Sequence, residues 1–383
     1  MTKFKTSLLA AAVAAAAFSA QAAEVSLYGS VSTGVLYTNT PTITGGTQAQ
    51  ESKNSFSMES GFWGDSIWGI TGEEDLGNGW TVGFTLENGF SSDTGEMAGA
   101  EDGQLFDSQA YLSIGNDFVK FAFGNIGGLA SAGGDFDLLC GFDPMEAFMG
   151  PAGLGAFASK DYASGNMAVA EITPLEGLKV SLMANAGDND SEEARWSDRD
   201  HYYGIGLSYE NGPLALAGIA EMRKYNTKAA WTTAGQDDTD SWTFTVAAAY
   251  DFEVVRPSFV YQHVSKTREF ASEAVEGNGA YNYDSFMLGA TAPLGQGTLR
   301  ASVQYVKGEN EYDSKDEANA TILGLAYTYD MSKRTTLYAG AYYSIGGDGL
   351  DKDLAQGEPE YTGGMARADY NSFGLGLGLV HTF

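Results

Sequence analysis

The chain has 383 residues, of which 50 are acidic and 21 basic, so its net charge at pH 7 is −29. A chain this acidic repels phosphate backbones, which argues against a nucleic-acid partner, and its one cysteine excludes an intramolecular disulfide. Three histidines leave little material for a metal site, so we expect neither a metal nor another cofactor. Abundant tyrosine, phenylalanine and glycine favour an all-β protein.

The first 22 residues have the features of an export signal. Lys3 and Lys5 form a basic start, a small-residue apolar stretch follows, and an A-x-A cleavage site occupies 20–22. The alternative, a membrane anchor, is disfavoured because the apolar stretch is too short to span a bilayer as a helix. We therefore predict a cleaved signal peptide over 1–22 and a mature chain over 23–383.

Segments with apolar residues at every second position recur throughout the mature chain. This alternation places side chains on opposite faces of a β-strand, one of them apolar. Strands are expected near 24–38, 65–74, 80–90, 106–115, 118–125, 161–173, 178–187, 201–210, 214–224, 241–251, 255–265, 283–292, 298–307, 319–329, 335–345 and 372–383. These segments number sixteen, and an even number is what a bacterial membrane barrel requires.

The connections between these segments decide which all-β architecture fits. Short turns alternate with long polar stretches at 40–60, 91–105, 126–160, 189–200, 225–239, 267–281, 308–318 and 346–370. A soluble β-sandwich is the alternative, but strict alternation of short and long connections is typical of outer-membrane barrels. The sequence thus predicts a 16-stranded antiparallel transmembrane β-barrel with an aqueous channel, short periplasmic turns and long external loops.

Several fragments occur in a definite order along the chain. They are VSLYG at 25–29, WG at 68–69, GEEDLG at 72–77, LENGF at 86–90, QAYL at 109–112 and YDMSKRTTLY at 329–338, with Phe383 as the last residue. In this order they resemble the strands and turns of the general, non-specific porins of β-proteobacteria, across the whole mature chain.

The resemblance implies a homotrimer of barrels in the cell outer membrane, each with its own pore. It implies contact with outer-membrane lipid and lipopolysaccharide, passage of ions and small hydrophilic solutes, and recognition of Phe383 by the barrel assembly machinery. It also implies that the third external loop, 126–160, folds inward and narrows the channel. The outward residues expected at the trimer contact are Leu27, Val31, Val35, Leu375 and Leu377.

Charged residues are the candidate determinants of what passes through the pore, because a low-dielectric wall focuses their field. The inward loop carries Asp135, Asp137, Asp143 and Glu146, together with Cys140, which we expect to be a buried small hydrophobe. The alternation also places Lys120, Lys179, Arg223, Arg256 and Arg300 on the lumen face. The acidic residues expected on the same face are Glu87, Glu171, Glu210 and Glu221.

Three positions depart from the family pattern. Ile67, Ser108 and Asn125 stand where relatives commonly carry arginine. Because the basic wall is reduced while the loop acids remain, we expect a moderate preference for cations. The second possible function is a barrel that works through its surface loops, as an adhesin or a structural protein. No enzyme is expected, since neither Gly-x-Ser-x-Gly nor His-Glu-x-x-His occurs.

Overall fold

The computed structural model describes residues 23–44, 47–99, 103–131, 133–146, 150–154, 164–187, 196, 199–225, 240–267, 281–310, 317–346 and 371–383. The predicted signal peptide and most of the predicted loops after residue 187 lie outside these ranges. Within them the chain is almost entirely β-strand, with two short 3-10 turns, η1 (Cys140–Phe142) and η2 (Gly150–Ala152). A helix long and apolar enough to span a bilayer is not found among the described residues.

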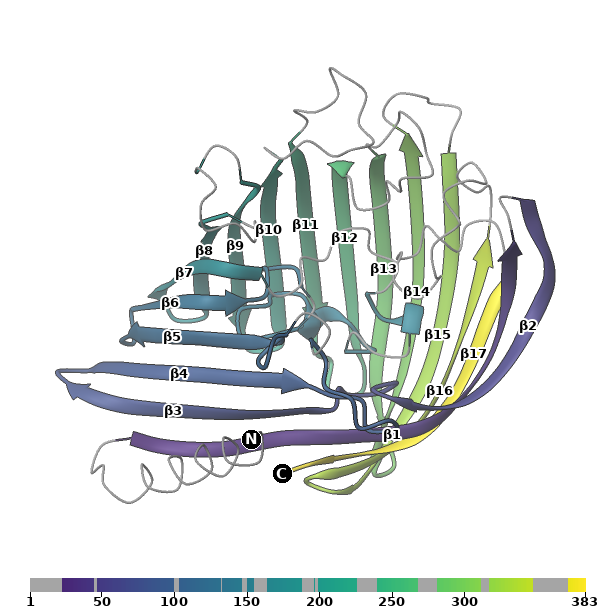
Figure 1. Cartoon of the computed structure of the whole chain (residues 1–383), viewed down its shortest axis with the longest axis horizontal. Coiled ribbons are helices and arrows are strands. Elements are labelled where there is room, and N and C mark those ends of the chain that lie inside the picture. The colour runs from purple at the N-terminus through teal and green to yellow at the C-terminus, as the bar shows by residue number, and fades with distance from the viewer. Residues whose placement is uncertain are drawn as a thin grey trace.

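All the strands belong to one antiparallel sheet (Figure 1). Their bounds are β1 (Ala23–Thr44), β2 (Thr47–Ser60), β3 (Ile67–Gly77), β4 (Trp80–Gly89), β5 (Gln109–Gly115), β6 (Val119–Ile126), β7 (Ser164–Leu175), β8 (Leu178–Asn185), β9 (His201–Asn211), β10 (Leu214–Lys224), β11 (Ser241–Tyr250), β12 (Arg256–Thr267), β13 (Tyr281–Leu294), β14 (Gly297–Asn310), β15 (Glu317–Ser332), β16 (Thr335–Gly346) and β17 (Ser372–Thr382). Each strand from β3 to β17 pairs with the next. Because β17 also pairs with β1, the sheet closes on itself.

β2 and β3 together make one strand of the wall. Ser30 of β1 pairs with Ile67 of β3 and also with Thr382 of β17, so these two strands lie on opposite edges of β1. Further along β1, the edge that faces β3 is taken by β2, and residues 61–66 separate the two segments. The wall therefore has sixteen strands, as predicted.

The predicted loop at 40–60 is wrong, because most of it is strand. β1 continues to Thr44 and pairs with β2 as a long hairpin. The polar sequence has no apolar alternation that would have revealed these strands. Strand pairing does not require apolar alternation, because the hydrogen bonds between the strands are made by backbone N–H and C=O groups.

The short turns match their predicted positions. Between β3 and β4, Gly77, Asn78 and Gly79 all have positive φ, of 83°, 56° and 78°. Glycine and asparagine tolerate this left-handed region, which most other residues avoid. The turn chemistry therefore explains why GNG follows the acidic end of β3.

The two faces of the wall differ as the alternation predicted. Large apolar side chains point outward, and many are well exposed, for example Leu27 (65%), Leu288 (59%) and Leu377 (56%). The intervening residues point into the barrel and include buried Thr245, Gln262 and many other polar or small residues. An outward apolar band with a mixed interior is the arrangement of a barrel that faces lipid.

Candidate functional site: the lumen and its two inward segments

The described part of the segment between β6 and β7 lies against the inner face of the wall. We call residues 126–154 the lumen loop. Near its start, the backbone N–H of Leu129 donates to the hydroxyl of Tyr202 on β9 (3.2 Å), and that hydroxyl donates to Glu221 on β10 (2.5 Å). Tyr202 and Glu221 thus tie the loop to two strands that follow it in sequence.

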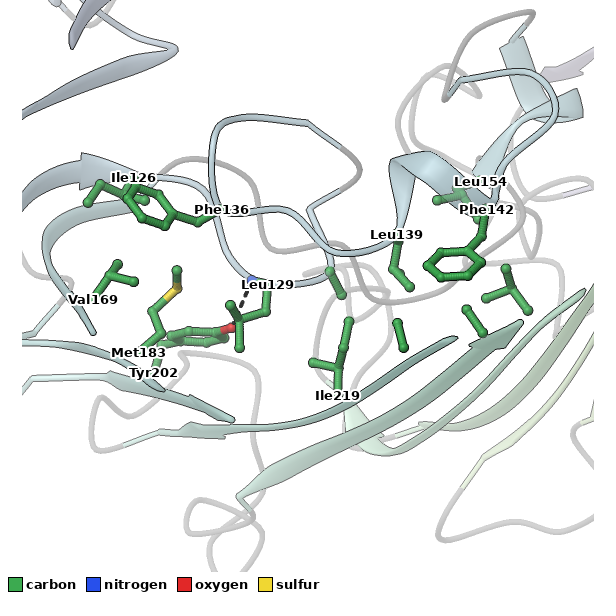
Figure 2. Close-up of a cluster of buried hydrophobic side chains, with 14 of the residues drawn as sticks. Ile126, Leu129, Phe136, Leu139, Phe142, Leu154, Val169, Met183, Tyr202 and Ile219 are labelled. Atoms are coloured by element: carbon green, nitrogen blue, oxygen red, sulfur yellow. Dashed lines mark hydrogen bonds between the residues drawn. The ribbon is translucent and has the colours of Figure 1, made fainter. Parts of the chain in front are cut away.

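Apolar contact fixes the lumen loop more extensively than these hydrogen bonds. Figure 2 shows loop side chains above the strands and Val169, Met183, Tyr202 and Ile219 from the wall beneath. The loop residues in this cluster are Ile126, Leu129, Phe136, Leu139, Phe142 and Leu154. Their burial in a dry interface favours one loop position, since each buried side chain of this size contributes about 1.5–3 kcal/mol.

The far end of the lumen loop is held by β14. Ser302 donates from its hydroxyl to the carbonyl of Ala152 (2.7 Å), and the Gln304 side-chain amide donates to the carbonyls of Pro151 and Ala152 (3.1 and 2.6 Å). Arg300 donates to the carbonyl of Pro144 (2.9 Å). Three successive inward positions of one strand therefore all engage the loop.

Glycines on the neighbouring strands make room for this contact. A Cβ added at Gly289 on β13 would lie 2.5 Å from the ring of Pro144, and one at Gly324 on β15 would lie 2.6 Å from Cβ of Ala152. Both distances are too short for real atoms. The inner wall is therefore hollowed on each side of β14 where the loop rests on it.

A second segment enters the lumen at the break between β2 and β3. We call residues 61–66 the break segment. Its Phe62 and Trp63 are 8% and 5% exposed and form a cluster with Tyr338 and Tyr342 of β16 and with Met145 and Ala152 of the lumen loop. The ring of Phe62 lies where a side chain at Gly376 of β17 would be. The break segment and the lumen loop thus meet inside the barrel.

One acidic side chain of the wall, Glu87, is acted on by an acid of the break segment and by an acid of the lumen loop. Asp65 and Asp135 both interact electrostatically with Glu87 of β4, whose carboxylate accepts a hydrogen bond from Tyr28 (2.8 Å). The backbone N–H of Asp135 donates to Gln109 of β5 (3.0 Å), and the hydroxyl of Tyr111 donates to its carboxylate. Asp135 and Asp65 are exposed.

The other three predicted loop acids have partners inside the protein. Asp137 accepts from the backbone N–H groups of Leu139 and Cys140 (3.1 and 2.7 Å). Asp143 is 3% exposed and accepts from Met145 and Leu154 (both 2.9 Å), while Glu146 pairs with Arg300 (2.7 Å). These carboxylates hold the loop in shape, and Asp135 alone among the four is exposed, although it also accepts from Tyr111.

Two of the predicted basic residues are also paired. Lys179 forms an ion pair with Glu171 (3.1 Å), as Arg300 does with Glu146. Lys120 lies over the ring of Phe136 of the lumen loop, 5.2 Å from its centroid. Arg223 lies near the end of β10, one residue before Lys224. Arg256 begins β12 and lies at the same level of the wall as Arg300, two strands away, because Thr291 of β13 pairs with both.

Comparisons with known proteins agree with this geometry. The model of the Gram-negative porin family matches residues 8–350. The chain belongs to this family. An outer membrane porin protein of Bordetella pertussis is 29% identical over 99% of this chain and all of its own length, and outer membrane porin protein 32 of Delftia acidovorans is 28% identical over the same shares.

Solved porins share the fold. An anion-selective porin from Comamonas acidovorans matches with a TM-score of 0.68 at 24% identity, covering 94% of this chain and all of the other. OmpT of Vibrio cholerae, in its trimer form, matches with a TM-score of 0.63 at 16% identity, covering 95% and 100%. The protein is therefore an outer-membrane porin channel.

The three positions that depart from the porin pattern have distinct surroundings. Ile67 starts β3 directly after the break segment, and Ser108 immediately precedes β5. Asn125 donates from its side-chain amide to the carbonyl of Asp107 (3.0 Å), so it joins β6 to the segment before β5. None of the three brings a positive charge to the acids described above.

Some residues of the site were missed or only partly anticipated from the sequence. Trp63 precedes the predicted second strand at 65–74 and Asp65 is its first residue, and neither was singled out as a site residue. Cys140 is half-buried, less than the full burial expected, and burial together with nearby Asp137 raises the pKa of its thiol to about 12. No group of ligands suited to a metal ion occurs within the described ranges.

Proposed function

We propose that this porin lets ions and small hydrophilic solutes diffuse passively across the outer membrane and that it prefers cations. The observation that supports the preference is the set of three acids from different segments, in which Asp65 and Asp135 both act on Glu87. By contrast, the charges of Arg300 and Lys179 are offset by carboxylates within 3.1 Å. We call the opening that the lumen loop and the break segment leave inside the barrel the aperture. A net negative field at the aperture attracts cations and repels anions.

The proposal concerns a property in which porins differ. The porin from Comamonas acidovorans is described as anion-selective. Ile67, Ser108 and Asn125 lack the positive charge that relatives commonly carry, which is the basis for expecting the opposite sign here. Only charges near the aperture should matter, because fields are screened beyond about 8 Å at physiological salt.

Reversal potentials test this preference. In a potassium chloride gradient across a planar bilayer, the unmodified channel should favour potassium, and the preference should weaken as the salt concentration rises. The Glu87→Gln and Asp135→Asn variants should each shift the reversal potential towards chloride, and the Asp135→Asn/Asp137→Asn pair should shift it no further than Asp135→Asn alone. Asp117→Asn, an exposed acid in the turn before β6, is the control and should change nothing. Chloride preference in the unmodified channel would contradict the proposal.

The alternative of an adhesin or structural barrel predicts a different result in the same apparatus. A channel for passive diffusion gives stepwise conductance increases as single proteins insert. A barrel that acts only through its loops needs no conduction. The relatives named above are described as porins, which favours the channel.

We further propose a homotrimer in contact with lipid and lipopolysaccharide, exported by a cleaved signal peptide over 1–22. OmpT of Vibrio cholerae is described in a trimer form, and Leu27, Val31, Leu375 and Leu377 offer adjoining exposed apolar surface on β1 and β17. Such surface suits either lipid or a neighbouring barrel, so the assignment to a subunit contact rests on the relatives.

Gel migration in mild detergent without boiling tests the trimer. We expect about three times the monomer mass, since apolar contacts between barrels persist under gentle conditions. Leu375→Asn should weaken the trimer, because it places an amide in the proposed contact. Leu288→Asn on β13, equally exposed but on another part of the wall, should leave it intact. A monomer in every gentle detergent would contradict this proposal.

A further inference from the structure

Arg300 contacts both segments that enter the lumen. One of its terminal nitrogens donates to the carbonyl of Pro144 (2.9 Å) and pairs with Glu146 (2.7 Å), both in the lumen loop. Its guanidinium carbon lies 4.6 Å from the centre of the Trp63 ring in the break segment. Its side chain is only 13% exposed. A strand residue thus joins Trp63 and Pro144, which are 81 positions apart in the sequence.

The two segments arrive at this point from opposite directions around the wall. The lumen loop leaves β6, crosses β9 and β10, and ends against β14, β15 and β16. The break segment comes from between β2 and β3 and covers β16 and β17. Between them they contact β9, β10 and β14 to β17, and Arg300 touches both segments.

The chemistry of an arginine suits this junction. A planar guanidinium can donate several hydrogen bonds in its plane while its face stacks on an aromatic ring. Because Glu146 offsets its charge at contact distance, Arg300 adds little positive field to the channel. Removing it would leave the half-exposed Glu146 carboxylate without this ion pair and would remove the Arg300 contacts with Pro144 and Trp63 at the same time.

We propose that Arg300 is a positioning residue that ties the lumen loop to the break segment, so that the two hold the aperture as one unit. The proposal rests on the channel function proposed above, and it assigns Arg300 a different role from a selectivity charge. Loss of the junction loosens both segments at the aperture while the barrel wall, with its continuous strand pairing, stays intact.

The decisive comparison is between Arg300→Ala and Arg256→Ala. Both remove one inward-facing arginine, but the Arg256 side chain makes no hydrogen bond or ion pair with the described residues, and its backbone pairs with Thr291 of β13. In single-channel recordings, Arg300→Ala should show severalfold more open-channel current noise and more brief closures than the unmodified channel. Arg256→Ala should show the same noise and the same number of closures as the unmodified channel. The heat-modifiable migration of the folded barrel should be the same in all three.

Cys140 gives a second measurement that does not depend on conduction. It is the single cysteine of the chain, it lies in the lumen loop, and burial holds its thiol in the unreactive protonated form. Its rate of modification by a methanethiosulfonate at fixed pH should rise severalfold in Arg300→Ala and remain unchanged in Arg256→Ala. Arg300→Lys, which can still pair with Glu146, should recover part of the slow rate.

Two further variants cover the case in which Arg300→Ala does not fold. Glu146→Gln removes the ion pair, and Trp63→Leu removes the stacked ring; each should raise the Cys140 rate and the current noise, with a smaller effect than Arg300→Ala. Equal noise and equal Cys140 rates in the Arg300 and Arg256 variants would overturn the positioning role. A silent unmodified channel would instead overturn the proposed function, while the Cys140 rates would still decide the role of Arg300.

Discussion

Deletion of Phe383 should lower the amount of folded porin in the outer membrane severalfold, with little effect on the stability of barrels that do fold. Phe383 contributes one main-chain hydrogen bond at the closure, from its N–H to the carbonyl of Gly29 (3.0 Å). A single bond of this kind is worth about 0.5–1.5 kcal/mol. The closing ladder from Ser30–Thr382 to Asn39–Phe373 does not need it.

A severalfold fall in the amount of folded porin in cells would therefore reflect recognition of Phe383 by the assembly machinery. It would not reflect weaker pairing between β17 and β1. Heat-modifiable bands from outer-membrane fractions measure the folded amount, and refolding of purified chain into detergent micelles measures the intrinsic ability to fold. Leu379→Ala removes a comparable outward apolar side chain from the same strand and should behave like the unmodified chain in both assays. Normal folded levels after the deletion, or failure of the deleted chain to refold in micelles, would contradict this assignment.

The wall could be predicted from the sequence because most of its outer face obeys one rule. Lipid accepts only apolar side chains, so Phe244 and Val246 on β11, or Leu375 and Leu377 on β17, mark every second position. The alternating short turns then fix the direction of successive strands. The apolar alternation and the short turns together are enough to predict sixteen strands and the pairing of β17 with β1.

The hairpin of β1 and β2 could not be predicted in the same way. Residues 40–60 are polar, and their pairing relies on main-chain groups, which are the same for every sequence. The break segment was hidden for a related reason. Phe62 and Trp63 fall between the predicted loop at 40–60 and the predicted strand at 65–74, and in the structure they turn inward onto Gly376 and the rings of β16.

The interior of the barrel was the least predictable part. A water-filled lumen predicts polar inward positions, yet Val169, Ile219, Val260 and Met287 point inward and are at most 5% exposed. They are apolar because the lumen loop covers them. On strands such as β10, where the outward residues are also apolar, periodicity cannot reveal which positions meet lipid and which meet the loop.

Excision of the lumen loop should widen the channel and destabilise the barrel, and both effects should be large. Ile126 and Ser164 are paired in register, so β6 and β7 can be joined by a short Asn-Gly turn in place of 127–163 without disturbing either strand. Single-channel conductance should rise severalfold because the loop no longer occupies the lumen. The cation preference should fall at the same time, since Asp135 is lost and Glu87 acts in a wider aperture.

The destabilisation has a specific physical cause that can be reversed. Excision exposes Val169, Ile219, Val260 and Met287 to the water of the lumen, at a cost of about 1.5–3 kcal/mol for each fully uncovered side chain. The temperature at which the folded band is lost on gels should therefore drop clearly. Replacing the four residues by Thr, Thr, Thr and Gln in the excised chain should recover much of that loss, because these positions then resemble an ordinary aqueous lumen.

A valine-to-threonine change on the outer face is the matched control for this rescue. Val246 is 50% exposed on the outward side of β11, so Val246→Thr in the excised chain places a hydroxyl towards lipid and should lower stability further. If valine-to-threonine substitution raises the stability of the excised chain on the inner face and lowers it on the outer face, the rescue is due to contact with water in the lumen. A general effect of threonine on stability would act in the same direction on both faces. An excised chain that conducts like the unmodified porin would mean that the loop leaves the ion path free, and the constriction would then have to lie elsewhere in the barrel.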